Sequence, residues 1–118
     1  MPEVTELEFH SKDLSDFQLN RLVRASLRKY SVSVTAFISD AVIVDDTCLG
    51  VSFDHSERDD AYHRVDGSIL RTGKIRAARK EGRFWLLETQ DGNYVIASFK
   101  QDLGRTSYLK LLDSADHF

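Results

Sequence analysis

The chain has 118 residues, of which 42% are hydrophobic and 30% are charged, and its formal net charge is −3. This length and composition are typical of one globular domain and exclude an intrinsically disordered chain. Uninterrupted apolar runs are too short for a membrane-spanning helix. The single cysteine, Cys48, excludes an intrachain disulfide and favours a reducing compartment. We therefore expect one cytoplasmic domain over residues 1–118, with no signal peptide at its acidic N-terminus.

Residues 3–10 alternate between polar and apolar side chains, which predicts an edge strand. Residues 11–30 then predict one long helix. Its N-terminus carries a capping box, in which the Ser15 hydroxyl accepts a hydrogen bond from a backbone N–H and the Gln18 side chain reaches back to the cap. Lys12–Asp13 is the alternative start, one turn earlier.

Two kinds of side chain recur along this helix at helical spacing. An apolar stripe predicts the face that packs on the sheet, and a basic stripe predicts a second face. The apolar stripe consists of Leu19, Leu22, Val23, Leu27 and Tyr30. The basic stripe consists of Arg21, Arg24 and Arg28.

The next segment predicts a meander of short strands. Residues 32–38, 41–44 and 47–53 are apolar or alternating, and turn signals separate them at Ser39–Asp40 and Asp45–Asp46. Aspartate is common in turns because its side chain hydrogen-bonds to the nearby backbone.

The most regular part of the predicted sheet follows. Alternating side chains over residues 68–78, 83–90 and 93–99 predict three antiparallel strands. Gly82 supplies the first turn, because glycine adopts positive φ without strain. Asp91–Gly92 supplies the second turn. An Asp-Gly pair between apolar runs predicts a type I′ turn, with positive φ at both positions.

These elements together predict an α+β fold, with an antiparallel sheet of about six strands packed against one long helix. Residues 54–66 are polar and lack a period, which predicts a surface loop. Residues 104–118 leave two alternatives open. Either Thr106 caps a terminal helix, or residues 108–112 add a strand.

Charge is distributed along the chain in two blocks. Residues 40–66 hold eight acidic residues, and residues 67–83 hold six basic residues against the single acid Glu81. Our first hypothesis is that the acidic block docks on a protein partner, with no catalytic residue, cofactor or metal involved. The acidic docking surface consists of Asp54, Glu57, Asp59, Asp60 and Tyr62.

The basic block supports a second hypothesis, in which a basic sheet face binds nucleic acid. Phe84, Trp85 and Tyr94 follow the basic residues and offer rings for stacking, and the basic stripe of the helix extends the surface. A solvated strand face with core aromatics is the alternative interpretation. The basic surface consists of Arg71, Lys74, Arg76, Arg79, Lys80 and Arg83.

Catalytic and metal-binding functions have less support in the sequence. His55, Asp59, Asp60 and His63 are close enough in sequence to bind a divalent cation, but their spacing matches no known metal motif. Cys48 lies among acidic and strand residues, which favours a core thiol over a nucleophile. P-loop, dinucleotide and nucleophile-elbow motifs do not occur. An enzyme or ligand-binding domain without a recognisable motif is therefore the third hypothesis.

One segment resembles a known group of proteins. The pattern RTGKI…FWLLETQDGNYVIASF resembles a hairpin sequence in small uncharacterised accessory proteins of bacteriophages and plasmids. The matching positions are Arg71, Thr72, Glu88, Thr89, Gly92 and Tyr94, and Gly73 departs from the expected serine. The resemblance implies an accessory role without a catalytic residue. Since some small acidic proteins of this kind block host defence nucleases, including CRISPR effectors, it also implies an inhibitor of a host defence complex.

Overall fold

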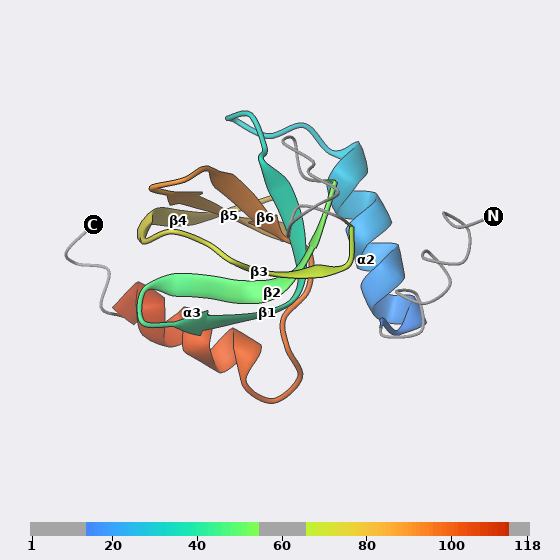
Figure 1. Cartoon of the computed structure of the whole chain (residues 1–118). Helices are drawn as coiled ribbons and strands as arrows, with labels where there is room; N and C mark the ends of the chain where they lie inside the picture. Colours follow the sequence, from blue (N-terminus) through green and yellow to red (C-terminus); the bar gives the residue numbers. More distant parts are fainter. Residues whose placement is uncertain (1–13, 55–65, 114–118) are drawn as a thin grey trace.

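The computed structural model describes residues 14–54 and 66–113. The predicted strand at residues 3–10 and most of the predicted acidic loop lie outside the described residues. The described residues form two helices and six strands (Figure 1). In chain order these are α2 (Asp16–Leu27), β1 (Ala36–Val44), β2 (Thr47–Phe53), β3 (Ser68–Arg71), β4 (Ile75–Glu81), β5 (Phe84–Thr89), β6 (Asn93–Ile96) and α3 (Gly104–Asp113).

The six strands form one mixed sheet in the order β3-β2-β1-β6-β5-β4. β1, β2 and β3 make one antiparallel meander, and β4, β5 and β6 make a second. The two meanders meet where β1 pairs with β6 in parallel, with Ala36 opposite Tyr94. The prediction of an antiparallel sheet is therefore wrong at this central pair. Side chains alternate in the same way in parallel and antiparallel strands, so periodicity does not reveal the direction of pairing.

A sharp corner joins the two edges of the sheet. β3 and β4 are the opposite edge strands, yet only residues 72–74 separate them. Four residue steps span at most about 14 Å, whereas a flat six-stranded sheet is about 24 Å wide, so the sheet must curl. Thr72 stabilises the corner through two hydrogen bonds to the Cys48 backbone, of 2.8 and 3.0 Å. The strand predicted over residues 68–78 is therefore two strands.

The two helices cover opposite faces of the curled sheet (Figure 1). α3 packs Tyr108 and Leu111 on the inner face, whose apolar cluster includes residues of all six strands. α2 packs Ala25 and Leu22 on the outer face. The prediction of one long helix is wrong, because the described helices have 12 and 10 residues, and the C-terminal segment is helical. Within the described residues, no helix has the length and apolar character needed to span a lipid bilayer.

The start of α2 confirms the predicted capping box. The Gln18 N–H donates to Ser15 Oγ over 3.1 Å, and the Ser15 N–H donates to Gln18 Oε1 over 2.8 Å. The predicted apolar stripe is only partly buried, because Val23 and Leu27 are exposed whereas Ala25 is fully buried. The packed face of α2 is therefore rotated from the predicted stripe towards Ala25.

The turn predicted at Asp45–Asp46 is confirmed, whereas the turns predicted at Asp91–Gly92 and Ser39–Asp40 differ in the structure. Asp45 and Asp46 both have positive φ, 50° and 63°, so the two-residue turn of type I′ character joins β1 to β2. Asp91 does not have positive φ, so the type I′ turn predicted at Asp91–Gly92 is wrong. Ser39–Asp40 is not a turn, because β1 continues through it with a β-bulge at which Asp40 has a φ of 58°.

Candidate functional site

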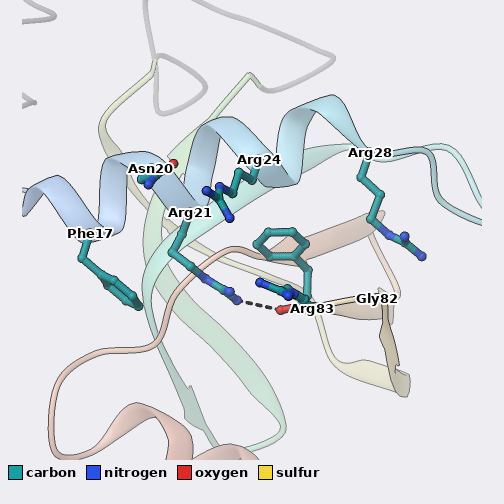
Figure 2. A pocket seen from close by; sticks show the side chains of 8 residues that line it. Phe17, Asn20, Arg21, Arg24, Arg28, Gly82 and Arg83 are labelled. Carbon is teal, nitrogen blue, oxygen red and sulfur yellow. Dashed lines mark hydrogen bonds between the residues drawn. The ribbon is translucent and has the colours of Figure 1, made fainter.

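A cleft of about 600 Å³ opens between α2 and the turn that joins β4 to β5 (Figure 2). Four arginines line it, and none of the described lining residues is acidic. The lining, which we call the arginine cleft, consists of Phe17, Asn20, Arg21, Arg24, Arg28, Gly82, Arg83 and Phe84. Positive charge in a concave surface focuses the electrostatic field, so the cleft is suited to an anionic ligand.

Helical spacing places three of these arginines along one side of α2. Arg21, Arg24 and Arg28 are three and four residues apart, so they follow one stripe of the helix surface. Figure 2 shows this row above the turn that carries Arg83. The stripe was predicted from the sequence, whereas the approach of Arg83 depends on how α2 packs across the sheet.

Gly82 permits the close approach of the turn and the helix. It has a φ of 65°, as expected of a turn glycine. A Cβ atom at this position would lie 2.8 Å from the guanidinium carbon of Arg28. Glycine therefore provides both the backbone conformation of the turn and the space that Arg28 occupies.

Arg21 forms the floor of the arginine cleft and has a structural role. Its Nε donates to the carbonyl oxygen of Ala97 over 2.9 Å, and its Nη2 donates to the carbonyl oxygen of Arg83 over 2.6 Å. Its guanidinium carbon also lies 4.4 Å from the centroid of the Phe84 ring. Because these contacts hold Arg21 in place, the three other arginines, which are exposed, are the ones that a ligand can approach.

Among the described residues, no acidic side chain lines the cleft to compensate its charge. Burial lowers the pKa of Arg21, and repulsion from Arg83, Arg105 and Arg24 lowers it further. Among the described residues, no carboxylate forms an ion pair with Arg24, Arg28 or Arg83. A bound anion would relieve this repulsion between guanidinium groups.

A second cavity, of about 330 Å³, adjoins the arginine cleft, because Phe17 and Arg21 line both. The Trp85 ring forms part of the wall of this second cavity. Lys80 Nζ and the guanidinium carbon of Arg105 each lie 5.6 Å from the centroid of that ring. The lining, which we call the aromatic cavity, consists of Phe17, Arg21, Trp85, Ser98, Phe99, Lys100, Gln101, Asp102 and Arg105. The Trp85 side chain is largely buried.

The structure distributes the six residues of the predicted basic surface over different places. Arg79 and Lys80 are consecutive in β4, so their side chains lie on opposite faces of the sheet. Arg79 forms ion pairs with Glu81 and Glu88, which neutralise its charge. Arg83 lines the arginine cleft. The exposed residues that line neither cavity are Arg71, Lys74, Arg76 and Lys80.

Only one residue of the predicted acidic docking surface belongs to the described residues. This is Asp54, which has a φ of 53° and whose N–H donates to Asp66 Oδ1 over 2.7 Å. The residues that lie outside the described ranges are Glu57, Asp59, Asp60 and Tyr62. The acidic docking surface therefore stays a prediction.

The other chemical hypotheses have these outcomes. The hypothesised metal ligands at positions 55–63 lie outside the described residues, and residues 14–54 and 66–113 contain no group of three side chains suited to a metal ion. Cys48 is fully buried in the core of the inner face. Burial raises the pKa of its thiol to about 12, which is typical of a structural cysteine and not of a nucleophile.

Comparison of the chain with protein-family models, curated proteins and solved structures gives no match. The resemblance to phage and plasmid accessory proteins therefore stays a prediction. Several residues of the site, among them Phe17 and Arg105, were not predicted from the sequence. Phe17 lies four residues before Arg21, so the helical spacing could have placed it on the same stripe. No local pattern relates Arg105 to Trp85.

Proposed function

We propose that this protein binds nucleic acid through the arginine cleft. We base the proposal on three arginines, Arg24, Arg28 and Arg83, which line one cleft and form no ion pair with a carboxylate of the described residues. A guanidinium group presents its donors in a planar fork that matches the oxygens of a phosphate. Nucleic acid supplies a row of phosphates, which suits a row of arginines along a helix.

This proposal favours the second hypothesis from the sequence over the first. The arginine cleft is formed by described residues with defined contacts, whereas four of the five residues of the acidic docking surface lie outside them. A phage- or plasmid-encoded inhibitor that docks on a host defence protein is the alternative proposal. The two differ in their expected ligand, and a nucleic-acid binding experiment therefore separates them.

The test is fluorescence anisotropy with a labelled oligonucleotide at several salt concentrations. A strand of about 20 nucleotides exceeds the footprint of roughly 4–16 nucleotides typical of a small binding domain. Three arginine–phosphate contacts should give a slope of about −2 in log K against log salt for a single strand, because each contact releases counterions. An absence of binding at low salt would refute the proposal.

Charge-removing variants locate the binding surface. Arg24→Gln and Arg28→Gln should each weaken binding about tenfold and make the salt slope shallower by about 0.7 to 1. Lys110→Gln is the matched control, because it removes the same charge from the last turn of α3 on the other face of the sheet. Loss of binding with Arg76→Gln but not with Arg28→Gln would assign the ligand to the exposed surface of β4 instead.

A further inference from the structure

Phe17 presents its ring to solvent at the boundary between the arginine cleft and the aromatic cavity. It is 69% exposed and lines both. No other ring among the described residues packs against it. Figure 2 shows the ring below α2, on the same side of the helix as Arg21. An exposed aromatic ring beside guanidinium groups is the arrangement on which unpaired bases stack in single-strand-binding proteins.

The aromatic cavity next to Phe17 has the size and the wall of a site for a planar group. Its volume of about 330 Å³ is near the lower end of the range of about 300–1,000 Å³ that is common for small-ligand sites. Trp85 and Phe99 supply an apolar wall, with ring centroids 4.6 Å apart in an edge-to-face pair. Lys100 and Arg105 add positive charge to the same lining.

Charge distinguishes the two parts of the site. The arginine cleft has four cations and no acidic residue in its described lining, whereas Asp102 lines the aromatic cavity. A carboxylate repels a phosphate but accepts hydrogen bonds from the amino groups of bases. Arg21 lies between the two parts and is held by backbone carbonyl oxygens. This division favours phosphates in the arginine cleft and a base in the aromatic cavity.

We infer that the site selects single-stranded nucleic acid, with its phosphates in the arginine cleft and one unpaired base stacked on Phe17 at the aromatic cavity. This inference rests on the proposed function. Phosphates are present in single strands and duplexes alike, so the arginines alone do not distinguish them. In a duplex the faces of the bases are covered by their neighbours, and Phe17 can stack only on a base that is unpaired and unstacked.

The test compares three kinds of labelled ligand of equal length by fluorescence anisotropy. They are a single strand with bases, prepared as DNA and as RNA, an abasic strand with the same phosphates, and a duplex. The protein should bind the strand with bases most tightly. Phe17→Ala should weaken its binding to that strand about 5- to 150-fold, the equivalent of one stacked base, and leave its binding to the abasic strand unchanged.

Two control variants accompany Phe17→Ala. Phe17→Tyr keeps an aromatic ring and should bind as the unaltered protein does. Leu109→Ala removes a side chain that is 52% exposed on α3, away from both cavities, and should have no effect. Because Phe17 is exposed, Phe17→Ala should have the same melting temperature as the unaltered protein, measured by circular dichroism. Equal melting temperatures would show that a change in binding does not come from a change in folding.

The possible failures are distinguishable. Equal binding of the base-bearing and abasic strands, an equal loss for both with Phe17→Ala, or tighter binding of the duplex would each overturn base stacking. Nucleic-acid binding through the arginine cleft would then still stand. If no ligand binds, or if Arg28→Gln changes nothing, the proposed function fails and this inference fails with it.

Discussion

The guanidinium carbon of Arg21 lies 4.4 Å from the centroid of the Phe84 ring, and this pair joins α2 to the outer face of the sheet. The same guanidinium group donates to two backbone carbonyl oxygens of the sheet and its turn. Arg24 and Arg28, further along the helix, are exposed, and neither side chain donates a hydrogen bond to a carbonyl oxygen of the described residues. The guanidinium carbon of Arg28 makes a ring contact, at 5.5 Å from the centroid of Tyr30. One basic stripe therefore has a part that holds the fold together and a part that is open to a ligand.

Arg21→Met tests the structural part. Methionine keeps much of the apolar length of the side chain but loses both hydrogen bonds to carbonyl oxygens. We expect the free energy of unfolding to fall by about 2–4 kcal/mol, because one hydrogen bond to a charged group contributes about 1.5–3 kcal/mol. Arg24→Met, the exposed neighbour, should change it by less than about 0.5 kcal/mol. Urea denaturation measures both, and equal values for the two variants would contradict the structural role of Arg21.

We expect an Asp→Gly substitution to have opposite effects on stability in the two hairpin turns. Asp46→Gly should stabilise the protein by about 0.5–1 kcal/mol, because Asp46 has a φ of 63° and glycine adopts positive φ without strain. Asp91→Gly should destabilise it by about 1–2 kcal/mol, because Asp91 Oδ1 accepts hydrogen bonds from the Gly73 N–H and the Thr89 hydroxyl, of 2.9 and 2.6 Å. Thermal melting measures both. Changes of the same sign would show that the turn assignments are wrong.

Glu81 should make stability depend on pH in acid. Hydrogen bonds from the Ser31 hydroxyl and N–H, followed by the contact with Arg79, lower the pKa of Glu81 from 4.5 to about 2. Because the folded state holds this proton less tightly than the unfolded state, the stabilisation is complete above about pH 4.5 and is lost as the pH falls towards 2.

Glu81→Gln isolates this effect from the other carboxylates. The difference in free energy of unfolding between the unaltered protein and Glu81→Gln should be constant above about pH 5 and should shrink as the pH falls. Chemical denaturation at a series of pH values measures that difference. A difference that stays constant down to about pH 2 would mean that Glu81 has no depressed pKa.

Cys48 should resist thiol reagents in the folded protein. Its side chain is fully buried, and burial raises the pKa of the thiol to about 12. At pH 8 the raised pKa alone lowers the thiolate fraction by about 10³-fold relative to an exposed cysteine, so labelling of the folded protein should be at least that much slower than labelling in denaturant. Rapid labelling without denaturant would show that the core around Cys48 opens readily.

The sequence by itself determined the elements whose stabilising contacts lie within a few residues. The Ser15–Gln18 capping box is one of these, because both of its hydrogen bonds join residues three apart. The strand at Thr47–Phe53 is another, because its alternation directly reflects which side chains face the core. The basic stripe of α2 follows from spacing along the helix alone.

Only the tertiary structure decided how these elements are joined. The parallel pairing of β1 with β6 depends on which edges of the two meanders meet, and side-chain alternation is the same for either direction. The corner at residues 72–74 exists because the sheet curls until its two edges come close. Arg83 joins the arginines of α2 only through packing of the helix across the outer face. The cleft therefore depends on contacts between residues far apart in the sequence, which no local residue pattern predicts.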